Sequence, residues 1–96
     1  MSAYVVFTRT KTIDQKEREK YWTGIQETMK GHPIEVLAAD GKHELLEGDP
    51  IEGMVIVKFP SVKAARDWID SEAYQDIAKH RKLGATYHGL IVEGLS

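Results

Sequence analysis

The residues best suited to chemistry are a histidine and an arginine near the end of a predicted helix, His80 and Arg81. Arg81 follows Ile77 by about one helical turn, so it lies on the apolar face and could bind a carboxylate with two hydrogen bonds. His80 could act as a general acid or base near neutral pH. Alternatively, both cations only stabilise the helix C-terminus through its dipole.

Three aromatic residues could form the wall of a pocket. Trp68 and Tyr74 flank a break between two predicted helices, and Trp22 lies on an earlier helix. Rings that carry one polar atom are frequent in small-molecule pockets, where the polar atom orients the ligand. The same residues are also typical of a hydrophobic core. The sequence therefore predicts either substrate-binding residues or ordinary core residues at these positions.

Two further polar residues lie at predicted strand ends and turns. Glu47 ends a short predicted strand and could accept a proton or pair with Arg81, or it could bind loop amides instead. His32 precedes Pro33 and could lie near the mouth of a pocket, or it could simply belong to a turn. Glu47 is therefore a candidate catalytic residue, and His32 a candidate substrate-binding residue.

Metal and cofactor motifs are missing from the sequence. The chain has no cysteine, and its four histidines show neither His-x-His nor His-Glu-x-x-His spacing. A haem would need an axial ligand on a pocket-facing helix, and His80 is the one candidate. There is no glycine-rich phosphate loop and no Gly-x-Ser-x-Gly elbow. The sequence therefore predicts no metal and no cofactor.

Composition indicates one ordinary globular domain over residues 1–96. The chain is 42% hydrophobic and 29% charged, with a formal net charge of −2. Nucleic acids and anionic membranes both favour a basic excess, so neither is an expected partner. No apolar run approaches the roughly 20 residues that span a bilayer, and no signal-peptide pattern opens the chain. Together with the lack of cysteine, this favours a cytoplasmic location.

Hydrophobic periodicity and turn residues predict the elements that must position these side chains. Strands are expected at Ala3–Arg9, Ile34–Ala39, Lys42–Glu47, Gly53–Phe59 and Thr86–Glu93. Helices are expected from the Asp14 cap to Lys30, from the Ser61 cap to Ile69, and from the Ser71 cap to Leu83. Asp40-Gly41 predicts a two-residue hairpin, because both residue types accept a positive φ.

This order predicts a ferredoxin-like α+β fold, β-α-β-β-α-β, with an antiparallel sheet and the helices on one face. The other face then lacks cover. Gly53–Phe59 is apolar on both sides, with Met54 and Ile56 pointing one way and Val55 and Val57 the other. Because so large an apolar patch is unusual on a monomer, we expect a homodimer in which a second copy packs sheet to sheet.

An RNA-recognition module shares this topology and is the main competing interpretation. Its sheet carries aromatic residues on which bases stack, preceded by a basic residue. Here Met54 and Ile56 occupy the aromatic positions and Glu52 the basic one. Since bases do not stack on aliphatic chains, RNA binding is disfavoured.

Several short motifs, in order along the chain, resemble one known family. They are Leu46-Glu47-Gly48, Phe59-Pro60-Ser61 with Ala64-Ala65, Trp68 with Asp70-Ser71 and Tyr74-Gln75, Arg81, and Val92-Glu93-Gly94. With this spacing the chain resembles the domain of unknown function 1330 family of the dimeric α/β-barrel superfamily. The resemblance implies a dimer whose sheets meet as a barrel, with a small pocket between sheet and helices in each subunit.

Two functions follow as hypotheses. In the first, the homodimer binds a small, anionic organic molecule, with cofactor-free acid/base catalysis as an option. Arg81 would anchor the anion, His80 or Glu47 would move a proton, and Trp22, Trp68, Tyr74 and His32 would contact the substrate. In the second, the dimer is a non-catalytic ligand-binding or interaction module. The sequence leaves open whether the chain is an enzyme.

Overall fold

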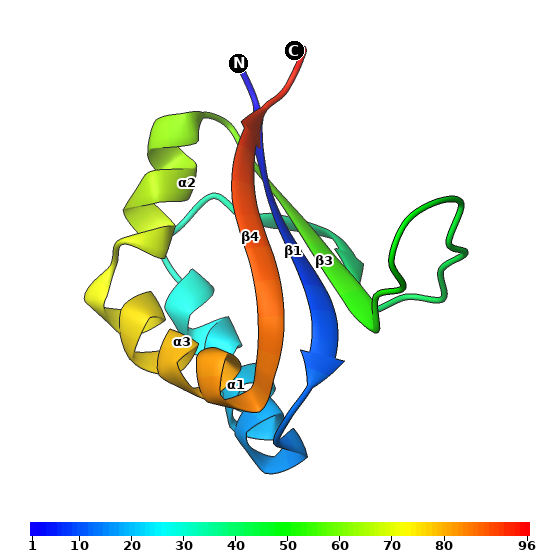
Figure 1. Ribbon diagram of the computed structural model, residues 1–96. Coiled ribbons are helices and arrows are strands. Elements are labelled where there is room, and N and C mark those ends of the chain that lie inside the picture. The colour runs from blue at the N-terminus through cyan, green and yellow to red at the C-terminus, as the bar shows by residue number, and fades with distance from the viewer.

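Four strands and three helices form a two-layer α+β fold in the computed structural model, which describes residues 1–96 (Figure 1). The elements are β1 (Ala3–Thr12), α1 (Gln15–Met29), β2 (Glu35–Ala39), β3 (Gly53–Phe59), α2 (Val62–Ile69), α3 (Glu72–Gly84) and β4 (Ala85–Glu93). The strand order is β2-β3-β1-β4, and each neighbouring pair is antiparallel. The predicted ferredoxin-like arrangement is confirmed. None of the helices is both long and apolar enough to cross a bilayer.

The predicted polar residues cap all three helices. The Asp14 carboxylate accepts from the backbone N–H of Lys16 at 3.0 Å, and Ser61 and Ser71 each accept from the N–H three residues later. These bonds satisfy amides that have no partner within the helix, so the chain turns helical at these residues. Glu17 does not complete a capping box at Asp14, because its carboxylate binds side chains outside the cap.

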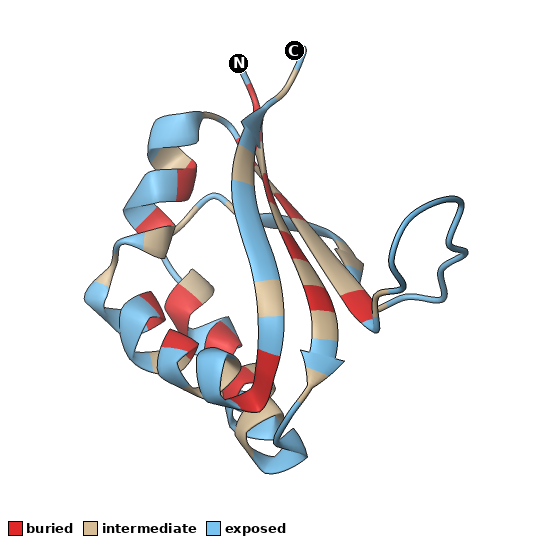
Figure 2. Ribbon diagram, viewed as in Figure 1, coloured by how far each residue is buried: buried red, intermediate tan, exposed pale blue.

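The core lies between the inner sheet face and the helices (Figure 2). Alternate residues of β1 and β3 point inward, so Val5, Val57 and Phe59 are buried. The Trp68 ring lies 4.3 Å from that of Tyr74 and 5.7 Å from that of Phe59, between centroids. Aromatic packing therefore joins both α2 and α3 to the sheet.

The predicted hairpin at Asp40-Gly41 and the strand Lys42–Glu47 are wrong. Asp40 has a positive φ of 54°, but Gly41 does not, so the expected turn does not form. Residues 40–52 are instead one long loop, and β2 pairs directly with β3. Leu45 and Leu46 of this segment are 51% and 90% exposed, so they do not hold it against the sheet edge, and a nearby cluster of charges uses the Asp40 side chain.

A charged clamp holds the two ends of this loop. The Arg9 guanidinium donates to the Asp40 carboxylate at 3.0 Å and to the Glu52 carbonyl at 3.1 Å. Arg18 of α1 donates to the same Asp40 oxygen at 3.0 Å. Gly53 completes the clamp, because a Cβ there would collide with Asp40 and Arg9. The clamp ties β1, α1 and the loop together where the predicted hairpin would have been.

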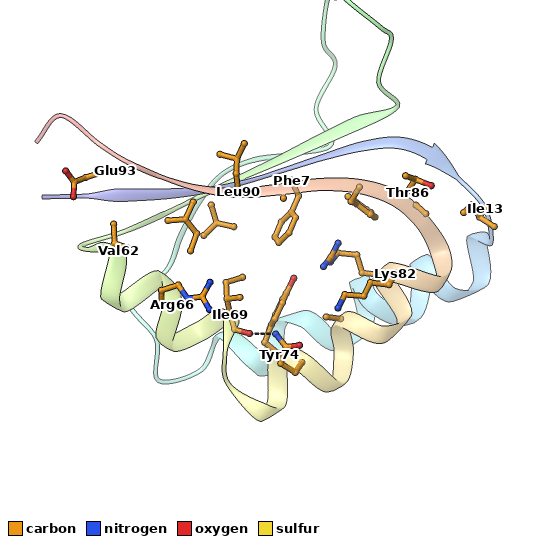
Figure 3. Close-up of a pocket in the computed structure, with 18 residues that line it drawn as sticks. Phe7, Ile13, Val62, Arg66, Ile69, Tyr74, Lys82, Thr86, Leu90 and Glu93 are labelled. Carbon is orange, nitrogen blue, oxygen red and sulfur yellow. Dashed lines mark hydrogen bonds between the residues drawn. The ribbon is translucent and has the colours of Figure 1, made fainter.

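The outer face of the sheet is apolar and has no helix over it. Val6 of β1 lies between Ile56 of β3 and Leu90 of β4 in the strand register, and Tyr4 pairs with Val92. The Leu90 side chain points away from the helices, on the side toward which the loop 40–52 also rises (Figure 3). The prediction that one face of the sheet lacks cover within the chain agrees with this arrangement.

Candidate functional site

A cleft of about 1070 Å³ lies between the inner face of β1 and β4 and the helices α2 and α3 (Figure 3). Its walls are mostly apolar and include Val5, Ile69 and Ile91. The polar residues among them include Arg81 and Tyr74 of α3. An apolar cleft with a few polar groups is the usual form of a small-molecule site.

Arg81 is the arginine of this chain that no carboxylate neutralises. Arg9 and Arg18 pair with Asp40, and Arg66 pairs with Asp70. Arg81 forms no ion pair and no side-chain hydrogen bond, and its Nε, like those of Arg9 and Arg18, is buried without a partner. The cleft therefore contains a cation whose hydrogen-bonding capacity is unused within the chain.

Two aromatic rings hold this guanidinium in place. Its central carbon lies 4.7 Å from the centroid of the Phe7 ring and 5.2 Å from that of Tyr87. The two rings meet edge to face, with centroids 6.3 Å apart. Cation–π contacts at these distances stabilise the charge without using its N–H donors. The two Nη groups, which form no hydrogen bond within the chain, remain available to a ligand.

A pair of tyrosines supplies the second polar group. The hydroxyls of Tyr74 and Tyr21 are 3.1 Å apart, and both rings are buried. Burial raises the pKa of Tyr21 far above its ordinary value; Tyr74 raises it further, and the charge of Arg81 opposes the shift. Tyr21 is thus a neutral hydroxyl. When it donates to Tyr74, the Tyr74 proton is free to donate into the cleft, toward which this hydroxyl points (Figure 3).

His80 does not line the cleft. Its Nδ1 lies 2.5 Å from a carboxylate oxygen of Glu17, so the pair joins α3 to α1. The hydrogen bond from His80, followed by that from Lys20, holds the pKa of Glu17 below its usual value. This contact gives His80 a structural partner away from Arg81.

The remaining predicted site residues also lie apart from the cleft. Trp22 and Trp68 line a separate apolar cavity of about 30 Å³, hardly larger than one water molecule, and the Trp68 N–H donates to Thr28. His32 borders a surface hollow beside Pro33 and Lys58. Glu47 is exposed in the loop 40–52. Of the predicted residues, the structure therefore brings together Arg81 and Tyr74.

Sequence reasoning missed Phe7 and Tyr87, which flank Arg81. The sequence did contain a signal for both residues, because alternate residues of a strand point to the same face. Phe7 lies two residues beyond Val5 and Tyr87 lies four before Ile91, so each ring is expected on the same face as that aliphatic residue. The identity of the inner face depends on where the helices pack. The approach of both rings to one guanidinium follows from the strand register.

Fold and cleft together define a ferredoxin-like α+β protein with a pocket between sheet and helices. The sequence profile of the family described as Domain of unknown function (DUF1330) matches residues 2–95, and the chain belongs to that family. No curated protein matches this sequence.

Solved structures with the same fold share little sequence with this chain. A protein of unknown function from Rhodopseudomonas palustris is 16% identical, with a TM-score of 0.76, over 99% of this chain and 83% of that one. SnoaB, a cofactor-independent oxygenase from Streptomyces nogalater, is 12% identical, with a TM-score of 0.62, over 99% and 94%. A dimeric protein of unknown function and ferredoxin-like fold from Bacteroides fragilis is 10% identical, with a TM-score of 0.57, over 97% and 96%. At these identities the likeness establishes the fold.

Proposed function

We propose that this protein is a homodimer that binds a small organic anion in the cleft between sheet and helices. The observation that carries the proposal is the Arg81 guanidinium, which lies in an apolar cleft with no anionic partner. A ligand carboxylate would supply the missing counter-charge through charge-assisted hydrogen bonds, which are stronger than bonds between neutral groups. A planar guanidinium matches a carboxylate with two parallel hydrogen bonds.

Tyr74 would provide the second contact to the ligand. Its hydroxyl points into the cleft and is supported from behind by the neutral Tyr21 hydroxyl. Arg81 and Tyr74 lie seven residues apart in α3, about two turns and on the same side, so one rigid helix would set the distance between the two groups. A ligand bound by both would be oriented as well as held.

A proton transfer in this cleft would involve groups other than the predicted His80 and Glu47. The cleft contains no histidine, and its one carboxylate is Glu93, near the end of β4. Tyr74, Glu93 or the ligand itself would have to move the proton. We therefore favour ligand binding as the primary activity, with cofactor-free acid/base catalysis as the further possibility to test by turnover.

Ligand binding is tested by comparing two arginines of the same cleft. Arg81→Met keeps the apolar stem and removes the unpaired cation, whereas Arg66→Met removes a cation already neutralised by Asp70. Titration calorimetry with benzoate and with octanoate should show at least tenfold weaker binding in Arg81→Met and a change of less than twofold in Arg66→Met. Equal affinities of wild type and Arg81→Met, in folded proteins, would contradict the assignment.

The apolar outer sheet face supports the homodimer. Leu90 is 53% exposed and Val92 is 48% exposed in the single chain, beside Val6, Ile56 and Tyr4. A second copy packed on this face would remove these side chains from water. A non-catalytic role of the dimer as an interaction module is the alternative function, and it would leave the cleft without a ligand.

Light scattering tests the oligomeric state. Wild type should have twice the chain mass of 10.8 kDa, and Leu90→Lys should shift it toward a single chain. Leu83→Lys is the matched control, since Leu83 is exposed on α3 and does not belong to the sheet. A wild-type mass of 10.8 kDa at micromolar concentration would refute the dimer.

A further inference from the structure

Charge is unevenly distributed along the cleft. Near the turn from α3 into β4, Arg81 and Lys82 line it, and neither forms an ion pair. At the α2 end lie Arg66 and Glu93, and there Arg66 is neutralised by Asp70, with hydrogen bonds of 2.7–3.1 Å. One end of the cleft is therefore positive, and the other is neutral to negative.

Apolar side chains occupy the length between these ends. Val5 and Ile91 line it from the strands, and Ile69 and Ala78 from the helices. Val62 extends this wall to the α2 end, far from Lys82, with Ile69 between them (Figure 3). A volume of about 1070 Å³ slightly exceeds the roughly 300–1000 Å³ typical of sites for drug-sized molecules. An acid as small as acetate would leave most of the apolar wall exposed to water.

We infer that the ligand of this cleft is an elongated amphipathic acid whose anionic group binds Arg81 and whose apolar body runs along β4 toward Val62. This inference rests on the proposed function and adds the chemical class and the direction of the ligand. The ligand carboxylate lies at the positive end of the cleft, beside Arg81, because Glu93 would repel it from the opposite end. The apolar body gains free energy by displacing water from Ile69 and Ile91.

A chain-length series tests the class of ligand. The affinities of acetate, butyrate, hexanoate and octanoate are measured with 1-octanol as the neutral match of the longest acid. Each added methylene should tighten binding about two- to fourfold, since the cleft is partly open to water. The alcohol should bind at least tenfold more weakly than octanoate, because it lacks the charge that Arg81 recognises.

One substitution at the α2 end of the cleft tests the proposed direction of the ligand. Val62→Glu puts a carboxylate where the apolar tail should lie, at the first residue of α2, where acidic residues suit the helix. It should weaken octanoate binding several-fold and leave butyrate binding unchanged. Leu83→Glu introduces the same charge at an exposed residue outside the cleft and should change neither.

The outcomes separate this inference from the proposed function. If acetate binds as tightly as octanoate and Arg81→Met abolishes both, the anion site stands and the elongated ligand is refuted. If octanoate binds equally well to Val62→Glu, the proposed direction is refuted. If no acid of any length binds wild type, both the inference and the proposed function fail.

Discussion

Removal of the Asp40 carboxylate should be among the most damaging single changes to this fold. Asp40→Ala leaves two cations without their shared partner, and the side chains of Arg9 and Arg18 are only 10% and 12% exposed. Removing one member of a fully buried ion pair costs roughly 3–5 kcal/mol. Because Asp40 itself is 24% exposed, water can enter the gap, and we expect about 2–3 kcal/mol.

Urea unfolding, followed by tryptophan fluorescence and circular dichroism, measures this loss. A loss of about 2–3 kcal/mol corresponds to a melting temperature roughly 10–20 °C lower in a domain of this size. Asp70→Ala is the matched control, because it also removes the carboxylate partner of an arginine. The Arg66 and Asp70 side chains are 56% and 54% exposed, so that change should cost less than about 1 kcal/mol.

Two results would refute this reasoning. The first is an Asp40→Ala protein that is no less stable than Asp70→Ala. The second is that Asp40→Ala lowers the free energy of unfolding by the same amount in a protein that already carries Arg9→Met as it does in wild type. If the damage comes from Arg9 losing its close partner and keeping only the 3.9 Å contact with the Glu52 carboxylate, removing that cation must reduce it.

Three further predictions concern contacts within the core and between α1 and α3. Thr28→Val removes the acceptor of the buried Trp68 N–H and should cost about 1–3 kcal/mol in urea unfolding; an unchanged midpoint would refute the role of this bond. The pKa of Glu17 is lower folded than unfolded, so its contribution to stability is present above the unfolded value of about 4.5 and is lost as the pH falls through the folded value. Glu17→Gln should therefore flatten the acid side of the stability profile, below about pH 4.5, and an unaltered slope there would contradict this. Gly84→Ala would place a Cβ 2.7 Å from a backbone nitrogen of α1, which cannot move aside, so thermal melting should show a loss of about 1–3 kcal/mol.

Much of the fold could be predicted because its signals are local. Asp14, Ser61 and Ser71 each satisfy an amide within three residues, so the helix starts can be inferred without the rest of the chain. The loop 40–52 could not be predicted in the same way. Asp40-Gly41 has the composition of a tight turn, but the Asp40 carboxylate is needed by arginines 31 and 22 residues earlier in the chain.

The candidate site divides in the same manner. Arg81 and Tyr74 could be predicted as inward-facing from helical spacing, because both lie on the apolar stripe of one helix. The partner of His80 could not be predicted from the sequence, since Glu17 is 63 residues away on another helix. Trp68, chosen as a pocket residue, is buried among Thr28, Phe59 and Tyr74, which depends on how three elements pack.

Sequence alone determined the order and kind of most elements, the two-sided apolar character of the sheet and the inward direction of Arg81, because all of these follow from periodicity and capping along short stretches. Tertiary structure decided which arginine is left without a carboxylate. Four arginines look alike in the sequence, and three of them find acidic partners once the chain is folded. Ion pairing depends on distance through space, so the cation available to a ligand becomes apparent only in the folded molecule.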